Sequence, residues 1–347
     1  MSKYIFAGEV CSAGTHAVAS VIQTTIQSLA DDPDLALSPK FDKARNKEYL
    51  AVDWDAEVHF RETFKQHKQG MFRDTNIVGE ESIKSSTDFS NEHGLIALTD
   101  MVDGTDLLER NLSNWCSAVV FFSREESRTE IVGACVGLPS RRIYFAHAET
   151  DIVRYLQFYP DTSRQPIYGP IKGPSNITQL ENSSICFYGQ KAKSLQKVAR
   201  TKLLDYLIAK EKQKNALKKK RDELADNRFL SVEREKVNRI YTLSGIPMMM
   251  RLIDHRVKDA ANIDVILQLT EQHPHDAVPG LYIAKKGGAF ILNLKTGREM
   301  TEEELTRGLL RPGHPDESMK YIVAATEALC TELAPLLEEV EAKASPL

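Results

Sequence analysis

Apolar residues follow a helical repeat near the N-terminus of the chain. Over residues 8–30 they recur about every 3.6 residues, which predicts an amphipathic helix that Asp31-Asp32-Pro33 ends. Residues 33–47 contain two prolines and several basic side chains, so a polar loop is expected there. A second helix is expected to begin near Asp53, with an apolar face of its own.

Short apolar runs further along predict buried strands. They lie at residues 77–79, 95–99, 117–122, 131–136, 143–146, 184–188 and 289–293. Helices are expected over most of residues 193–238 and at 245–255, 278–286 and 319–342. Strands alternating with helices indicate an α/β protein. Residues 159–180 are rich in Pro, Gly, Ser and Thr and are expected to link two halves, 1–170 and 171–347.

Composition narrows the class of protein further. The 347 residues are 42% hydrophobic and 27% charged, an ordinary balance that supports a sizeable core. A net charge of −4 gives no reason to expect nucleic acid or an anionic membrane as the main partner. The five cysteines contain no Cys-x-x-Cys pair, which favours reduced thiols in a cytoplasmic protein. The N-terminus lacks the pattern of a signal peptide, and no apolar run suits a membrane span.

Acidic residues gather in three clusters, each beside an expected strand or helix end. The clusters are Gly79-Glu80-Glu81-Ser82, Asp100-Met101-Val102-Asp103-Gly104-Thr105 and His275-Asp276, the last followed by Gly287-Gly288. Carboxylates drawn from distant parts of one chain are the oxygen ligands that Mg²⁺ prefers. The clusters therefore predict a magnesium site.

The second cluster combines metal ligands with a phosphate site. Asp100 and Asp103 are three residues apart, so both can reach one pair of cations, and the Val102 carbonyl is a further hard-oxygen ligand. Gly104 lets the backbone approach a phosphate closely, and Thr105 places a hydroxyl beside a metal-bound water. A helix that starts here would offer free N–H groups to the anion.

The remaining clusters complete two cation positions. Glu80 would complete one and Asp276 the other, and two cations about 4 Å apart suit an in-line phosphoryl transfer. Each fragment alone also has a structural reading, since Asp-Gly-Thr is a common turn and Glu-Glu-Ser or Asp276 can cap a helix. The ordered combination favours a metal-dependent phosphatase.

These motifs resemble those of the inositol monophosphatase family, within the wider superfamily of lithium-sensitive and fructose-bisphosphatase-type phosphatases. The resemblance covers about residues 8–300. It implies a layered αβαβα sandwich and a Mg²⁺-dependent phosphomonoesterase that acts on an inositol-phosphate-like or sugar phosphate. It also implies two or three Mg²⁺ ions, sensitivity to lithium and a homodimer.

The same resemblance implies which residues hold the metal ions. It assigns the first Mg²⁺ to Glu80, Asp100 and the Val102 carbonyl, and the second to Asp100, Asp103 and Asp276. The resemblance also implies that Glu80 shares a weaker third ion.

The family's remaining site residues also have counterparts here. Thr105 helps to activate the attacking water, and Asp53 supports it, with Asp55 as the alternative. The Gly104 and Thr105 N–H groups hold the phosphate.

Departures from the family pattern leave the substrate open. His275 replaces a tryptophan and is either a substrate contact or a packing histidine. Leu269 stands where an acidic substrate contact is expected, and the nearby Glu271 is out of register. Pro279 replaces an alanine, and as a first-turn proline it supports Asp276 as the helix cap. A bisphosphate substrate, adenosine 3′,5′-bisphosphate or fructose 1,6-bisphosphate, is the alternative.

A basic helical insertion is expected at about residues 191–238. Between Lys191 and Asp222 there are twelve Lys and Arg against three acids, including Lys218-Lys219-Lys220-Arg221. It is interpreted as a solvated helix face, with an anion-steering flank as the alternative. Its expected packing face is Leu195, Val198, Leu203, Tyr206 and Leu207. Sparse aromatic residues disfavour nucleic-acid binding. A non-catalytic scaffold that uses this helix is the rival from another functional class.

Overall fold

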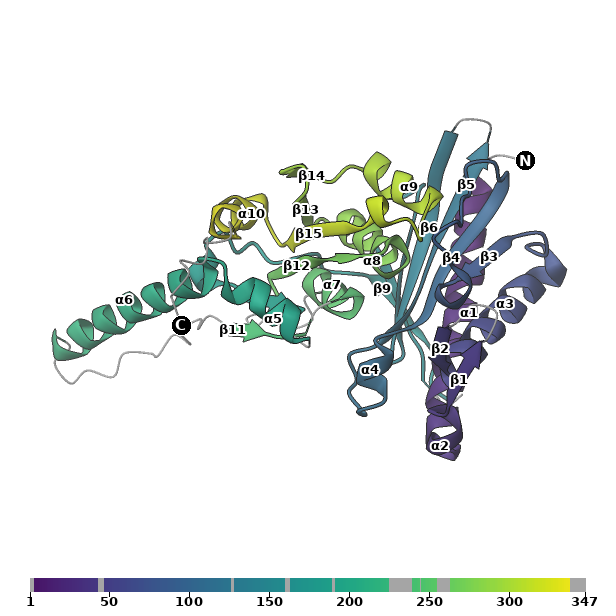
Figure 1. Cartoon of the computed structure of the whole chain (residues 1–347), viewed down its shortest axis with the longest axis horizontal. Helices are drawn as coiled ribbons and strands as arrows, with labels where there is room; N and C mark the ends of the chain where they lie inside the picture. The colour runs from purple at the N-terminus through teal and green to yellow at the C-terminus, as the bar shows by residue number, and fades with distance from the viewer. Residues whose placement is uncertain are drawn as a thin grey trace, which may run out of the picture.

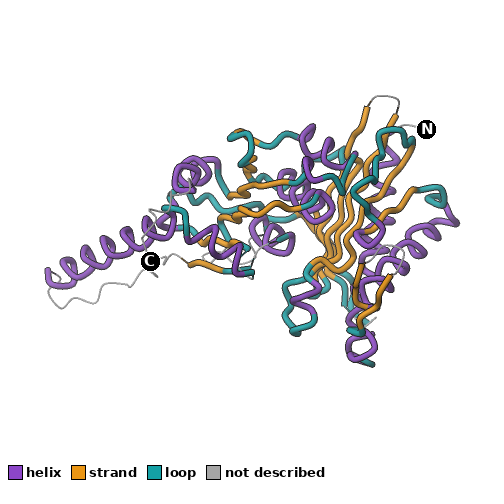
Figure 2. The backbone as a smooth tube through the Cα atoms, viewed as in Figure 1, coloured by secondary structure: helices purple, strands orange, loops and turns teal. Residues whose placement is uncertain are grey.

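The computed structural model describes residues 3–42, 47–125, 128–159, 163–188, 191–224, 239–243, 245–254 and 263–337. Two β-sheets alternate with three layers of helices (Figures 1 and 2). Three apolar clusters fill the spaces between these layers. This confirms the predicted αβαβα sandwich.

The first layer packs two long helices on the larger sheet. They are α1 (Lys3–Asp31) and α3 (Ala51–Gly70), and Val18, Ile22 and Phe64 from their apolar faces are fully buried. The repeat predicted over residues 8–30 is thus confirmed as a helix. Between them lie α2 (Pro33–Ala36) and a hairpin of β1 (Pro39–Asp42) and β2 (Lys47–Leu50). The expectation of a loop at 33–47 was therefore wrong for α2 and β1.

The larger sheet has seven strands. In spatial order they are β3 (Asn76–Gly79), β4 (Gly94–Asp103), β5 (Cys116–Glu125), β6 (Arg128–Leu138), β7 (Arg142–His147), β8 (Arg154–Gln157) and β9 (Ile167–Pro170). Only β3 and β4 pair in parallel, so both carry the chain toward the same edge of the sheet. Two short helices follow at that edge, η1 (Glu80–Ser82) and α4 (Thr105–Leu108). Strand β9 lies inside the segment 159–180 that was expected to be a linker, so that expectation was wrong for residues 167–170.

The middle layer lies between the two sheets. It contains α7 (Ile246–Ile253), α8 (Pro274–Lys286) and α9 (Glu302–Leu310). Helix α8 is buried almost all round because it contacts strands of both sheets. It begins at Pro274, so Asp276 occupies its third position and is not the cap, which is His273. Pro279 consequently lies in the second turn, and its predicted first-turn place was wrong.

The second sheet has six strands. In order they are β11 (Arg239–Tyr241), β10 (Ser184–Phe187), β12 (Val265–Gln272), β15 (Met319–Ala324), β13 (Phe290–Asn293) and β14 (Arg298–Glu299). The helix predicted at 319–342 was wrong at its start, where β15 forms. This strand is central and covered on both faces, so all its side chains except Lys320 are buried. A continuous apolar run fits such a strand.

Helices of the outer layer cover the second sheet. They are α5 (Ala192–Ala199), α6 (Leu203–Leu224) and α10 (Glu327–Leu333), with the short turns η2 (Leu180–Asn182), η3 (Pro315–Glu317) and η4 (Ala334–Leu337) elsewhere in this half. Helix α6 extends away from the sheets (Figure 1). Val198, Leu203 and Leu207 are buried as predicted, whereas Leu195 is exposed.

Parts of the basic stretch lie outside this description. Residues 225–238 are outside the described residues, as are the side chains of Lys218–Arg221. Among the described helices, none combines the length and apolar character that a bilayer crossing requires. The first sheet uses residues 76–170 and the second 184–324, and the division into halves at residue 170 stays a prediction.

Candidate metal centre

A β-bulge at the end of β4 shapes the centre of the site. Asp100 pairs with Ala118 and Asp103 with Cys116, so β4 contains one more residue than its partner over this stretch. The bulge turns the backbone so that the Val102 N–H donates to Asp100 Oδ1 at 3.1 Å. The Ser117 hydroxyl donates to the Met101 carbonyl at 2.7 Å and holds the irregular segment.

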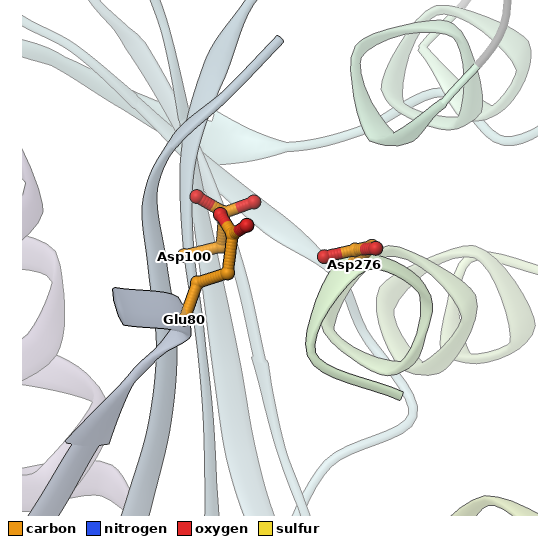
Figure 3. A group of neighbouring side chains, drawn as sticks. All are labelled: Glu80, Asp100 and Asp276. Carbon is orange, nitrogen blue, oxygen red and sulfur yellow. The ribbon is translucent and has the colours of Figure 1, made fainter. Parts of the chain in front are cut away.

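Three carboxylates converge in front of this bulge. Ligand oxygens of Glu80, Asp100 and Asp276 all lie within 4.8 Å of one another. Figure 3 shows Glu80 and Asp100 at the end of the first sheet, facing Asp276 on α8. Three of the predicted ligands, which are up to 196 positions apart in the sequence, are therefore brought together.

Electrostatics at this centre fit a hard divalent cation. Asp100 is only 4% exposed. Burial, followed by the charges of Glu80, Asp103 and Asp276, raises the pKa of Asp100 well above its ordinary value. A cation between these carboxylates would offset both the burial and the repulsion, and an all-oxygen donor set suits Mg²⁺ or Ca²⁺.

The Asp103 carboxylate lies beside Cys116 and the start of α7. Among the described residues it is not part of the group within 4.8 Å. Its Oδ2 lies 3.6 Å from Cys116 Sγ, and the Ile246 backbone N–H at the start of α7 donates to its carboxylate. Burial raises the pKa of Asp103 from 3.8 to about 7. Its predicted role as a ligand of the second ion stays a prediction.

Gly104 and Thr105 form the turn after the bulge. Gly104 has a φ of 97°, and a Cβ there would lie 3.2 Å from the Asn114 carbonyl oxygen, so both conformation and space favour glycine. Thr105 begins α4, a helix of four residues whose first N–H groups have no partner within the helix. Thr105 Oγ1 lies 3.0 Å from the Val102 carbonyl and 3.0 Å from Asp53 Oδ1.

Asp53 reaches this turn from α3, and Asp55 does not. Asp53 accepts the Leu50 N–H at 3.0 Å as well as the Thr105 hydroxyl. Burial raises the pKa of Asp53 from 3.8 to about 7. Asp55 lies in a small cavity between α1 and α3, beside His59. The structure thus joins Asp53, and not its alternative, to Thr105.

The two candidate substrate residues lie in unlike surroundings. His275 is 6% exposed, and its Nε2 lies 3.0 Å from Asp276 Oδ1, so it contacts a candidate ligand directly. Glu271 has a side chain 58% exposed and pairs with Lys320 at 3.6 Å. Leu269 packs against the apolar cluster between the second sheet and the outer layer of helices. Neither candidate's role in substrate binding is tested by these contacts.

Sequence reasoning missed two residues near the centre. Glu57 is a buried carboxylate on α3, one turn after Asp53, and the spacing of four residues on a helix was its only sequence signal. Tyr188 follows β10 and is half-buried. Burial raises the pKa of its phenol, and Asp106, Asp103 and Asp276 raise it further. No motif in the sequence marks Tyr188.

Comparison with known proteins identifies the architecture. No protein-family model matches the chain, and no curated protein matches its sequence. Solved structures do match. The SuhB extragenic suppressor protein of Bartonella henselae has 12% identity and a TM-score of 0.58, and the match covers 94% of this chain and 97% of that one. The chain has the inositol monophosphatase fold.

Two other structures with the inositol monophosphatase fold were solved with ligands. An IMPase/NADP phosphatase complexed with NADP and Ca²⁺ matches at 13% identity and a TM-score of 0.56, over 99% of this chain and 98% of that one. IMPase-II of Staphylococcus aureus, bound to inositol monophosphate, matches at 13% identity and a TM-score of 0.54, over 94% of both chains. At such identities the similarity establishes the fold.

Proposed function

We propose that this protein is a Mg²⁺-dependent phosphomonoesterase that hydrolyses a small, soluble phosphate ester. The observation that carries the proposal is the convergence of Glu80, Asp100 and Asp276 within 4.8 Å. Burial of Asp100 beside two other carboxylates is costly without a cation, which supports a metal site over a structural cluster. Phosphatase relatives with the same fold support the reaction class.

In this proposal, bound Mg²⁺ neutralises the phosphate charge and lowers the pKa of a water. Glu80, Asp100 and Asp276, with the Val102 carbonyl, hold the ions. Asp103 is retained as a ligand of the second ion, and Asp103→Asn should abolish turnover and leave the fold intact. Two ions suffice for this ligand set, and a third would use Glu80.

Thr105 and Asp53 handle the proton of the attacking water. A water that donates to Thr105 Oγ1 transfers its proton to that oxygen as the Thr105 hydroxyl proton passes to Asp53, 3.0 Å away. A pKa of about 7 suits Asp53 as the acceptor near neutral pH. The N–H groups of Gly104 and Thr105 hold the phosphate at the start of α4.

Two observations guide the choice of substrate class: the ligands of relatives with this fold and the charged residues of this chain. Inositol monophosphate and NADP are bound by two relatives with this fold, so an inositol-phosphate-like or sugar phosphate is the first candidate. His275 and Glu271 are the candidate substrate contacts. A bisphosphate is the second candidate, favoured by the basic residues of α5 and α6. We also propose a cytoplasmic homodimer inhibited by lithium, without a nucleic-acid or membrane partner.

The test is phosphate release from a panel of esters, with Mg²⁺ and with EDTA. The panel holds inositol monophosphates, sugar mono- and bisphosphates, 2′-AMP, NADP and adenosine 3′,5′-bisphosphate. Release that requires Mg²⁺ and is lost in Asp276→Asn would support the proposal and name the substrate. Release that persists in EDTA would contradict the metal mechanism, and a protein that binds no divalent cation would favour the scaffold.

A further inference from the structure

Helix α3 carries a buried carboxylate, Glu57, one turn beyond Asp53. Its side chain is 5% exposed, and Arg61 pairs with it at 2.8 Å from the next turn of the same helix. A buried charge is stable only when it is paired and hydrogen-bonded. Arg61 supplies a charge partner, and Glu57 also contacts the loop that carries Glu80.

Glu57 lies directly against Gly79, the residue before Glu80. A Cβ built on Gly79 would lie 1.9 Å from Glu57 Oε2 and 2.0 Å from the carboxyl carbon. The carboxylate therefore occupies the space that any side chain at position 79 would need. Gly79 has a φ of −96°, which every residue adopts, so the contact with Glu57, and not the backbone conformation, favours glycine here.

Ser82 fixes the other end of the same turn. Its hydroxyl oxygen accepts the Gly79 N–H at 3.0 Å, and it lies 3.0 Å from the Gly79 carbonyl and 3.4 Å from Glu57 Oε1. The Ile83 N–H closes the turn by donating to the Gly79 carbonyl at 3.2 Å. Glu57 thus touches both Gly79 and Ser82, the residues on either side of the Glu80-Glu81 pair.

We propose that Glu57 is a positioning residue that holds the Gly79–Ser82 turn and thereby orients Glu80 toward Asp100 and Asp276. The role rests on the proposed function, since it concerns the same cation. Helix α3 would then orient two parts of the centre at once, Thr105 through Asp53 and Glu80 through Glu57. Residues that orient metal ligands typically change metal affinity about 10–100-fold when substituted.

Affinity for Mn²⁺, measured by titration calorimetry, tests this role without relying on turnover. Glu57→Ala should weaken Mn²⁺ binding about 10–100-fold. Glu57→Gln keeps the size and an acceptor oxygen for Ser82, and should weaken binding less. The matched control is Glu62→Gln, which removes one charge from an exposed position of the same helix and should leave the affinity unchanged. Equal affinities in all three variants would overturn the positioning role.

A double-substitution cycle with Gly79→Ala tests the contact itself. Gly79→Ala alone should lower the melting temperature and weaken Mn²⁺ binding, because its methyl group displaces the Glu57 carboxylate. Added to Glu57→Ala, the same methyl group has room, so it should lower the melting temperature little further. Additive losses would overturn the contact. These melting temperatures are measured in EDTA, so they decide the contact even if the unsubstituted protein binds no Mn²⁺, which would contradict the proposed function instead.

Discussion

The Thr105 hydroxyl donates a hydrogen bond to the Asp53 carboxylate across 3.0 Å, joining two residues 52 positions apart. Asp53 lies in the first turn of α3, and Thr105 begins α4 at the end of the β4 bulge. The bond connects the first layer of helices to the edge of the larger sheet where Asp100 lies. It also orients the Thr105 hydroxyl, to which we assign the proton of the attacking water in the proposed function.

Asp53→Asn should reduce kcat and leave metal affinity almost unchanged. Asparagine can keep the bond to Thr105 but cannot accept a proton, so kcat should fall about 100-fold or more. Steady-state kinetics on the ester found by the panel, with Mn²⁺ affinity measured in parallel, checks this. Asp55→Asn is the matched control, since Asp55 lies in the cavity beside His59. An equal loss in both variants would contradict the role of Asp53.

The order of the acidic motifs was enough to predict much of the centre from the sequence. Each motif follows a strand or opens a helix, and such ends meet where β3 and β4 run parallel. Glu80, Asp100 and Asp276 do lie within 4.8 Å of one another, and their role as metal ligands stays a prediction. The choice of Asp53 over Asp55 came from the resemblance and agrees with the hydrogen bond to Thr105.

Contacts that depend on packing between distant elements could not be predicted. The approach of Glu57 to Gly79 exists only because α3 packs on β4, the strand that pairs with β3, and no spacing in the sequence encodes that distance. The buried place of His275 follows from α8 lying between two sheets. Strand β15 was mistaken for part of a helix because a short apolar run fits either element until its neighbours are known.

Asp100→Asn should stabilise the metal-free protein and abolish divalent-cation binding. Asparagine keeps the oxygen that accepts the Val102 N–H and removes one of three close charges. The melting temperature in EDTA at pH 8 should therefore rise, while the stabilisation by Mn²⁺ disappears. Glu125→Gln, at the exposed end of β5, is the control and should change neither quantity. A lower melting temperature in EDTA would contradict the repulsion between these carboxylates.

Raised pKa values make the metal-free protein less stable as pH increases. Asp53 and Asp103 have pKa values of about 7 in the folded protein and ordinary values near 3.8 when unfolded. Between these limits the folded state holds protons that the unfolded chain has lost, so their contribution to stability decreases as pH rises. It is fully present below about pH 4 and lost above about pH 7.

The contribution of Asp103 to this pH dependence can be isolated by comparing the unsubstituted protein with Asp103→Asn, both in EDTA. The variant does not titrate at this position, so it should gain stability relative to the unsubstituted protein as pH rises from 5 to 8. Melting temperatures across that range give the difference directly. Saturating Mn²⁺ should reduce the pH dependence of the unsubstituted protein, because the cation favours the charged carboxylates. A difference that does not grow with pH would show that the pKa of Asp103 is not raised.

A buried ion pair links the larger sheet to the middle layer of helices. Arg142 on β7 contacts Asp254, the residue that ends α7, at 2.7 Å, and the Tyr144 hydroxyl donates to the same Asp254 oxygen at 2.8 Å. The side chain of Arg142 is 12% exposed and that of Asp254 is 4% exposed. Arg142→Met should destabilise the protein by about 3–5 kcal/mol, because it removes the Arg142 charge from beside the buried Asp254 carboxylate.

Chemical denaturation checks this magnitude against a surface pair on the adjacent strand. Arg128 pairs with Glu130 but is 75% exposed, so Arg128→Met should cost less than about 1 kcal/mol. The buried pair matters for the centre as well, because the first residue of α7, Ile246, donates to Asp103. Arg142→Met should therefore also weaken Mn²⁺ binding, whereas Arg128→Met should not. Equal costs for the two substitutions would mean that Asp254 finds compensation without Arg142.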